Sequence, residues 1–248
     1  MKTPDPSRLD HQLQNLKLPW MRENLDPLAA TAARDSWTHA QFLAALAEGE
    51  LAQRRDRAVR RRIAQARFPV VKTLEGFDWS WPKVNELEVK DLFRLRFIEE
   101  KANVVLLGGC GLGKTHLATA LGHEACLRGY RVLFTSAAEL INRLLAAKAE
   151  HRLDAELKRV CRPEVLLLDE IGYIPIDKHG ADLLFQVISR RYEQGSIILT
   201  SNKAYKDWAE IFNHDQTVTS AILDRLLHHV TTITLTGKSY RMGKKIKN

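Results

Sequence analysis

The sequence predicts an α/β fold in which a parallel five-stranded sheet lies between two layers of helices, preceded by a small helical domain. Five short apolar runs alternate with helical patterns after residue 101; they are residues 103–107, 131–135, 164–168, 196–200 and 231–235. Continuous apolar runs are typical of strands that are buried on both faces. Their alternation with helices indicates three layers.

The helical patterns fall near residues 114–128, 137–160, 179–194, 205–212 and 217–229. Leu184, Val187 and Ile188 recur at helical spacing in the third of these, and Gly195 is a suitable end for that helix. Each helix follows one strand and precedes the next, which is the connection that parallel strands need.

Residues 1–69 are expected to form the helical domain, and residues 70–101 a linker to the α/β domain of residues 102–248. Thr38 and Gln41 have the spacing of a capping box, which predicts a helix from about residue 39 to residue 67. Turn signals are expected before it at Pro19, Pro27 and Asp35. The second half of the helix is strongly basic and carries Arg54, Arg55, Arg57, Arg60, Arg61, Arg62 and Arg67.

The overall composition is basic, with a formal net charge of +8 and a pI of about 9.5. A basic balance favours polyanionic partners, because each neutralised phosphate releases a condensed counterion. No run of 18 apolar residues occurs and no apolar block follows the first charges, so we expect no membrane span, no secretory signal and a cytoplasmic location. Cys110, Cys126 and Cys161 are scattered, as in proteins with reduced thiols.

A phosphate-binding motif joins the first expected strand to the helix that follows it. The pattern G-x-x-x-x-G-K-[ST] is complete, and with the next residue it predicts nucleotide contacts from Gly108, Gly109, Cys110, Gly111, Leu112, Gly113, Lys114, Thr115 and His116. Glycines let the backbone amides wrap around phosphate oxygens at a helix N-terminus. Lys114 is expected to reach the terminal phosphates, and the Thr115 hydroxyl to bind Mg²⁺.

Two carboxylates end the third apolar run. We expect Asp169 to hold Mg²⁺ and Glu170 to activate the attacking water. A small-molecule kinase has an acceptor substrate and does not require a water-activating glutamate next to its metal-binding aspartate. The pair therefore favours hydrolysis of a nucleoside triphosphate, that is ATP with Mg²⁺, coupled to conformational work.

Three polar residues outside these motifs are weaker candidates for contacts with the nucleotide. Asn202 follows the fourth run and is a candidate to contact the γ-phosphate or the attacking water. Arg225 is a candidate to stabilise the γ-phosphate of a neighbouring subunit, or else a surface residue paired with Asp224. Arg241 is a candidate phosphate contact within the same subunit, or part of a solvated basic tail. His228 and His229 are adjacent, so on a continuous helix they would not share a face, and we expect no metal site there.

In the order of these motifs, the sequence resembles the IstB-like helper ATPases of bacterial insertion sequences. The most specific stretches are Asp-Glu-Ile-Gly-Tyr from Asp169 and Asp-Arg-Leu-Leu-His-His from Asp224, and the stretch from Arg67 to Asp78 fits the same family. The likeness covers nearly the whole chain and is weakest in its first 35 residues. Their relatives are the DnaC-type helicase loaders.

The resemblance implies an N-terminal helical domain followed by an AAA+ module, in which the strand before Asn202 lies between the two strands that carry the nucleotide motifs. Asn202 would be sensor 1, Arg225 the arginine finger and Arg241 the sensor 2 residue, although we expect no helical lid after it. The protein would assemble with ATP as a ring or spiral homo-oligomer on double-stranded DNA and recruit a partner transposase. The expected DNA contacts are Arg54, Arg55, Arg57, Arg60, Arg61 and Arg62.

Three other interpretations are considered. A helicase loader shares the ATPase core and differs in its partner. A small-molecule kinase predicts an acceptor pocket and no role for DNA. A non-hydrolysing interaction module would not need Lys114, Thr115, Asp169 and Glu170 together.

Overall fold

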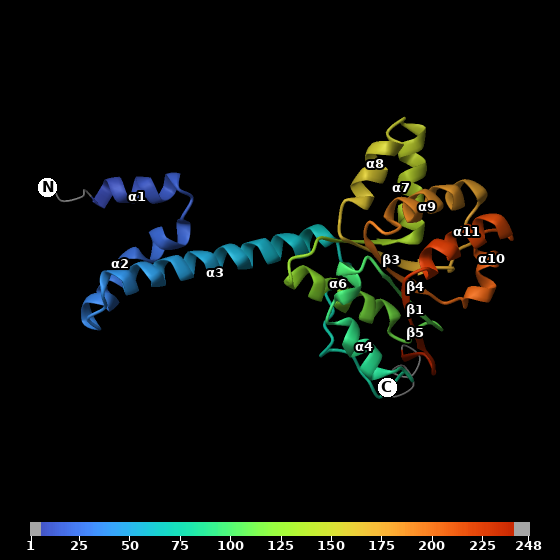
Figure 1. Cartoon of the computed structure of the whole chain (residues 1–248), viewed down its shortest axis with the longest axis horizontal. Coiled ribbons are helices and arrows are strands. Elements are labelled where there is room, and N and C mark those ends of the chain that lie inside the picture. Colours follow the sequence, from blue (N-terminus) through green and yellow to red (C-terminus); the bar gives the residue numbers. More distant parts are fainter. Residues whose placement is uncertain (1–5, 241–248) are drawn as a thin grey trace, which may run out of the picture. The chain divides into compact units, whose positions relative to one another are not determined.

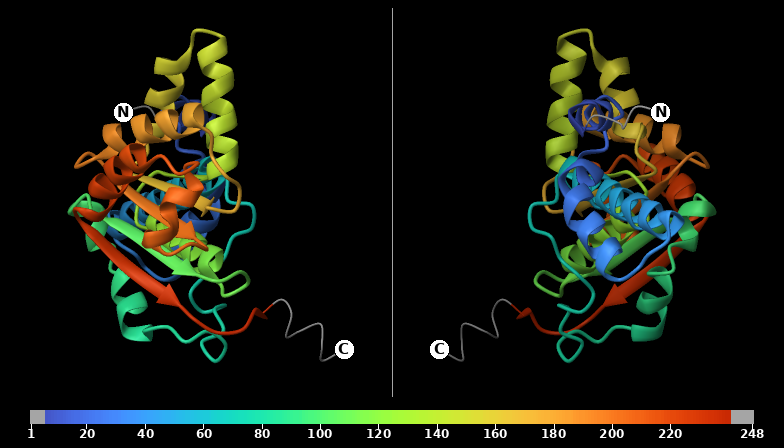
Figure 2. Two further views of the ribbon diagram at one scale, coloured as in Figure 1. Left: turned by 90° about the vertical axis from the view of Figure 1, so that its right-hand side faces the viewer. Right: turned by 90° about the vertical axis from the view of Figure 1, so that its left-hand side faces the viewer.

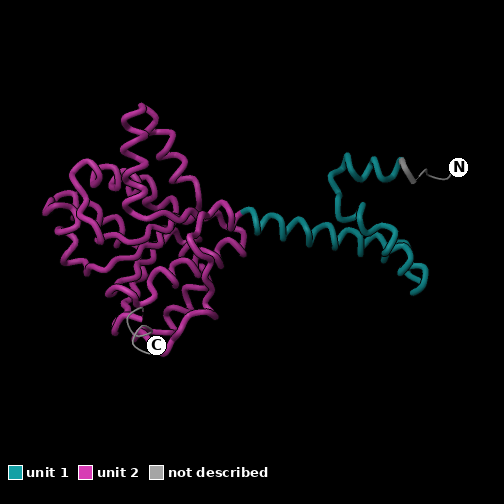
Figure 3. Tube along the Cα trace, turned by 180° about the vertical axis from the view of Figure 1, so that it is seen from behind, with its two compact units in different colours: residues 1–61 teal, residues 62–248 magenta. Residues whose placement is uncertain are grey.

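The computed structural model describes residues 6–240 and forms two compact units, unit 1 (residues 1–61) and unit 2 (residues 62–248) (Figure 3). The division falls inside the long helix α3 (His39–Ala66), whereas we expected the helical domain to end at residue 69. No described helix is both long enough and apolar enough to cross a membrane.

Unit 1 contains α1 (Pro6–Asn15), α2 (Pro19–Arg34) and the first part of α3. The capping box is confirmed, because the Thr38 amide donates to Gln41 Oε1 (2.8 Å) and the Gln41 amide donates to Thr38 Oγ1 (3.2 Å). The expected turn at Pro27 is wrong, since Pro27 lies inside α2. A proline removes one helical hydrogen bond, and the alanine-rich sequence that follows it favours the helix.

The contact between α2 and α3 depends on a buried carboxylate. Glu50 is 2% exposed and accepts hydrogen bonds from the Trp20 and Met21 amides at the start of α2. Gly49 lies under the Trp20 indole, where a Cβ would be 2.0 Å from the ring. Among residues 8–61 only Leu46 and Glu50 are buried, so unit 1 has a small core of its own.

Unit 2 has the alternating strands and helices expected from the sequence (Figure 1). In chain order after α3 its elements are α4 (Glu86–Leu92), α5 (Arg96–Glu99), β1 (Asn103–Gly108), α6 (Lys114–Leu127), β2 (Val132–Ser136), α7 (Ala137–Ala149), α8 (Leu153–Cys161), β3 (Val165–Ile171), α9 (Lys178–Arg191), β4 (Ser196–Ser201), η1 (Tyr205–Asp207), α10 (Trp208–Ile211), α11 (Gln216–Leu227) and β5 (Val230–Leu235).

The strands form one parallel sheet in the order β2-β3-β4-β1-β5. This confirms the predicted five-stranded parallel sheet and places β4 between β1 and β3. The carboxyl ends of β1, β3 and β4 therefore lie side by side, and each is followed by one of the nucleotide motifs or by Asn202.

Both faces of the sheet are covered, because alternate strand residues point to opposite sides. Val105, Leu166 and Leu199 belong to a core shared with α7, α8, α9 and α11. Leu106 and Leu167 belong to a second core shared with α4, α5 and α6. The three-layer prediction is therefore confirmed, and it explains why the strands read as continuous apolar runs.

The segment expected as one helix over residues 137–160 is a hairpin of α7 and α8 (Figure 2). The chain reverses at His151, whose φ of 55° is left-handed. Folding back brings Leu157 of α8 into the core that contains Leu144 of α7, and Arg143 pairs with Glu156 over 2.5 Å. One straight helix could not bury both leucines there.

Candidate nucleotide site

The phosphate-binding motif is a loop between β1 and α6. Gly113 precedes α6 with a φ of 91°, and a Cβ at this position would lie 2.7 Å from the Phe77 ring. Gly111 has a φ of 75°, and a Cβ there would meet the Ser239 hydroxyl at 2.3 Å. Left-handed backbone and close neighbours both require glycine, so the sequence forms the tight loop that phosphate binding needs.

Lys114 is held inside this loop. Its side chain is buried, and Nζ donates to the carbonyl oxygens of Gly108 and Gly109, each at 2.7 Å. A buried ammonium at a helix N-terminus is a strong attraction for phosphate, because solvent screens it little. The arrangement places a positive charge where the terminal phosphates of a nucleotide are expected.

Thr115 and Asp169 come together from the two motifs. The Thr115 hydroxyl donates to Asp169 Oδ1 over 3.0 Å, and Asp169 is buried at the end of β3. A hydroxyl and a carboxylate oxygen at this spacing are hard ligands of the kind that Mg²⁺ prefers. The residues present therefore fit Mg²⁺, which would be held by Thr115 and Asp169.

Glu170 lies on an irregularity in the sheet. The pairing of β3 with β4 shifts register between Leu168 and Ile171, and Glu170 has a left-handed φ of 63°. Bulges turn a side chain out of the regular alternation, and strained backbone of this kind concentrates at functional sites. The result is that Asp169 is buried while the adjacent Glu170 side chain is exposed.

Thr200 connects both carboxylate residues, although its sequence pattern did not single it out. Its hydroxyl donates to Asp169 Oδ1 over 2.5 Å and accepts a hydrogen bond from the Glu170 amide over 2.9 Å. Thr200 is fully buried on β4. The only signal in the sequence was its place in the Thr-Ser-Asn end of the fourth apolar run, two residues before Asn202.

Asn202 follows β4 at the same edge of the sheet. Its Oδ1 is buried and has no hydrogen-bond partner among the described residues. The amide lies against Gly172, which follows β3. Because buried polar atoms are rarely left unpaired, this acceptor is suited to a group that a bound ligand or its water supplies.

The connector and the chain after β5 border the loop as well. His116 Nε2 is hydrogen-bonded to the Thr73 carbonyl (2.9 Å), and its ring packs edge-on against Phe77. The Tyr240 amide donates to the Gly111 carbonyl over 2.9 Å. The sequence indicated only a linker over residues 70–101; the structure places Thr73 and Phe77 of this segment beside the phosphate loop. Arg241 lies outside the described residues.

Two further side chains link the motifs at their tips. Cys110 is exposed on the loop and interacts with Tyr173, which follows β3. Partial burial, together with the nearby Cys110 thiol, raises the pKa of Tyr173 above its usual value. The loop tip thus contacts the segment that follows Glu170.

Arg225 is not brought to this site. Its guanidinium stacks over the Phe185 ring (4.7 Å) and lines a small cavity with Asn103 and Ile197, near the starts of β1 and β4. The phosphate loop follows the other end of β1, at Gly108. The five steps of about 3.3 Å from Asn103 to Gly108 separate the two ends of the strand by roughly 17 Å. Arg225 and the loop therefore lie at opposite ends of the strands of one sheet.

The arginines of α3 differ in their surroundings. Arg54 donates to Glu50 and to the Lys17 carbonyl, and Arg62 donates to the Cys126 carbonyl. Four others are exposed, with no ion pair or hydrogen bond in the described part of the chain; they are Arg55, Arg57, Arg60 and Arg61. These four form the free arginine set, and three of them, at positions 57, 60 and 61, share one helix face.

Comparison with known proteins identifies close relatives. Residues 11–248 match the family described as IstB-like ATP binding protein. A protein of Pseudomonas aeruginosa, named as an ATP-binding protein of insertion sequence IS21, is 44% identical over 240 residues, covering 96% of this chain and 90% of the relative. Another, of Geobacillus stearothermophilus and named for insertion sequence IS5376, is 40% identical over 239 residues, covering 96% and 95%.

Solved structures share the fold of a large part of this chain. A replication initiator DnaA bound to AMPPCP and single-stranded DNA aligns with a TM-score of 0.55 at 24% identity, over 71% of this chain and 54% of that chain. The DnaC helicase loader aligns with a TM-score of 0.51 at 25% identity, over 60% and 87%. The fold is that of AAA+ proteins, and the chain belongs to the IstB-like ATP-binding proteins of insertion sequences.

Proposed function

We propose that this protein hydrolyses ATP with Mg²⁺, assembles through ATP on double-stranded DNA, and assists a partner transposase. The observation that carries the proposal is the joined arrangement of Thr115, Asp169 and Glu170 beside the phosphate loop, in a member of an insertion-sequence family. Membership in a family of ATP-binding proteins supports ATP as the nucleotide. The relatives named for insertion sequences support a role in transposition.

The chemistry follows from the positions of the side chains. Lys114 and the loop amides would bind the phosphates, while Mg²⁺ would neutralise charge on the phosphate oxygens. Glu170 would accept a proton from the attacking water, and Asn202 Oδ1 would orient that water. An exposed carboxylate suits this role because the proton it takes can pass to solvent.

Thr200 gives a test of how Glu170 is positioned. Replacing Thr200 with valine removes both hydrogen bonds, so the Glu170 amide and Asp169 each lose the partner that holds them in place. We expect the rate of hydrolysis in single-turnover assays to fall about tenfold or more, with nucleotide affinity changed less. Thr200→Ser keeps the hydroxyl and should stay near wild type. Equal activity of the valine and serine variants would remove the positioning role.

Assembly is supported by the place of Arg225. Because it lies across the sheet from the phosphate loop of its own chain, it could contact a γ-phosphate only on another copy. One copy would then present its loop to the Arg225 of the next, which gives a repeating, head-to-tail arrangement such as a ring or spiral. ATP between copies would make assembly depend on the nucleotide.

DNA contact is proposed for the free arginine set. Four exposed guanidinium groups without internal partners suit phosphate oxygens, which arginine binds by paired hydrogen bonds. Arg54 and Arg62 are also proposed, but part of their hydrogen-bonding capacity is used within the protein. No residue pattern indicates base readout, so binding should depend little on the DNA sequence.

Replacing Arg55, Arg57, Arg60 and Arg61 with alanine is expected to weaken binding to duplex DNA at least about tenfold. The slope of log affinity against log salt concentration should also become shallower, by about 0.9 for each DNA phosphate that the protein no longer neutralises. Fluorescence anisotropy over a range of salt concentrations measures both. A matched variant removes four exposed lysines of unit 2, Lys101, Lys148, Lys178 and Lys206. If both variants lose affinity equally, the arginines are not a specific DNA contact.

The alternatives separate in one comparison of ATPase rate and particle size with and without duplex DNA. We expect duplex DNA to raise both. A small-molecule kinase would be indifferent to DNA, and a non-hydrolysing module would show no turnover. A helicase loader would bind its helicase rather than a transposase; the insertion-sequence relatives favour the transposase, and co-purification with each partner distinguishes them.

A further inference from the structure

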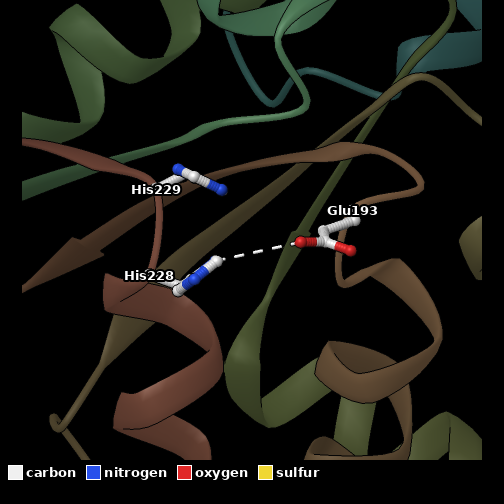
Figure 4. Close-up of side chains that lie close together, drawn as sticks. All are labelled: Glu193, His228 and His229. Carbon is white, nitrogen blue, oxygen red and sulfur yellow. Dashed lines mark ion pairs between the residues drawn. The ribbon is translucent and has the colours of Figure 1, made fainter.

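Two histidines and a glutamate meet at the end of unit 2 where β1 and β4 begin (Figure 4). Ligand atoms of Glu193, His228 and His229 all lie within 4.8 Å of one another. His228 Nδ1 is 3.9 Å from Glu193 Oε1, and the two imidazole ring centres are 4.2 Å apart. All three side chains are exposed.

Helix ends explain why the side chains converge. We expected one helix to run through residues 217–229, which would have turned the two histidines apart. That expectation is wrong, because α11 ends at Leu227 and β5 begins at Val230, so His228 and His229 lie in the turn between them. Glu193 follows α9 in a left-handed conformation, with a φ of 56°.

The end of α9 is rigidly held. Arg191, its last residue, is buried and donates to the carbonyl oxygens of Glu164 and Ser196, each within 2.8 Å, and to two others. These bonds fix the chain just before Tyr192 and Glu193 to the starts of β3 and β4. The carboxylate therefore extends from a defined point rather than from a free loop.

The charges around the three side chains include groups that favour a bound cation and groups that oppose it. The C-terminal ends of α9 and α11 both face the cluster, and helix C-termini carry partial negative charge. Asp224, one helical turn before His228, adds a carboxylate. Burial, Glu193 and then Asp224 raise the pKa of the neighbouring Tyr192. Lys101 and Arg225 oppose this, although the Arg225 guanidinium already stacks on Phe185 and donates to the Ala221 carbonyl.

We propose that Glu193, His228 and His229 form a site for one zinc-like divalent transition-metal ion, separate from the nucleotide site. Two imidazole nitrogens and one carboxylate are ligands typical of Zn²⁺, whereas Mg²⁺ and Ca²⁺ prefer oxygen alone. Water would fill the remaining position because the cluster is open to solvent. The ion would tie the end of α9 to the end of α11, the helix that carries Arg225.

Small side-chain movements suffice. Ligand atoms at about 2.0–2.2 Å from a tetrahedral Zn²⁺ lie roughly 3.3–3.6 Å apart, so the present 4.8 Å span must close by somewhat over 1 Å, which rotation of the exposed side chains can supply. His228 Nδ1 is also hydrogen-bonded to the Tyr192 hydroxyl over 3.0 Å. An ion that takes this nitrogen replaces that bond, so Tyr192 competes with the metal.

The test is calorimetric titration of ZnCl₂ into the full-length chain without nucleotide, Mg²⁺ or DNA. A Cys110→Ser background removes the exposed thiol of the phosphate loop. We expect one ion per chain, about 100-fold or more weaker binding when His228 and His229 are both alanine, and about tenfold weaker binding for Glu193→Gln. Tyr192→Phe should bind at least as tightly as the parent.

The matched control replaces two exposed histidines outside the cluster, His151 and His179, with alanine, and it should bind like the parent. The proposal is overturned if the parent binds no more zinc than the His228/His229 variant, or if the control loses as much affinity. Because nucleotide is absent, the result does not depend on the proposed ATPase function. Circular dichroism and thermal melting of each variant show that the fold persists.

Discussion

Replacing Lys114 with alanine is expected to lower the rate of ATP hydrolysis about 100- to 1,000-fold, the scale seen when one charge-stabilising donor is removed from an active site. The ammonium is buried in the loop and held by the Gly108 and Gly109 carbonyls, so water cannot take its place. Affinity for ATP should fall as well, because the same charge attracts the phosphates before reaction.

The control is Lys148→Ala, which removes an exposed lysine of α7 and should leave turnover unchanged. Since Lys114 is buried, thermal melting of both variants must show that the fold persists. Wild-type turnover in a folded Lys114→Ala variant would mean that this loop does not bind the reacting phosphates.

Glu170→Gln is expected to reduce hydrolysis about 100- to 10,000-fold while ATP still binds, because an amide of the same shape cannot accept the proton of the attacking water. The side chain is exposed and the backbone bond to Thr200 is unchanged, so stability should be unaffected. ATP-loaded assemblies should then accumulate on duplex DNA, which gel filtration and nucleotide analysis of the isolated complex would show.

Asp182→Asn makes the same change of carboxylate to amide on the exposed surface of α9 and should behave as wild type. The ratio of ATP binding to turnover distinguishes the possible roles of Glu170. If Glu170→Gln hydrolyses ATP at the normal rate, another group activates the water. If it loses ATP binding, Glu170 contributes to the ground state rather than to the chemical step.

Much of unit 2 follows from the sequence for a simple reason. Parallel strands that are buried on both faces must be apolar along their whole length, so the runs that became β1, β3 and β4 stood out clearly. The phosphate motif was equally clear, because its glycines meet backbone requirements that other residues satisfy poorly. The place of β4 between the two motifs could be expected only through the family resemblance.

What could not be predicted depends on contacts between distant segments. The bond of Thr200 to Asp169 requires knowing that β3 and β4 are neighbours in a particular register, and the irregularity at Glu170 changes that register locally. The turn at His151 is stabilised by the packing of α7 against α8, which the local sequence does not reveal. The approach of His228 and His229 depends on where α11 ends, and helix ends are poorly specified by periodicity alone.

The place of Arg225 could not be predicted for the same reason. The sequence indicated a helix before the last strand but not which end of the sheet its arginine would face. The structure puts Arg225 beside the start of β1, so its proposed role on phosphate requires a second copy. The sequence of one chain could not distinguish an arginine that contacts the nucleotide of a neighbouring copy from a surface arginine paired with Asp224.

Calorimetric titration of ATP into the purified chain, with Mg²⁺ and then with a chelator in its place, tests the nucleotide site on which the proposed function depends. We predict one ATP per chain, with binding that weakens when Mg²⁺ is withdrawn and becomes indifferent to Mg²⁺ when Asp169 is replaced by asparagine. Failure of the chain to bind ATP, or binding to which neither Mg²⁺ nor Asp169 makes any difference, would contradict the proposed site.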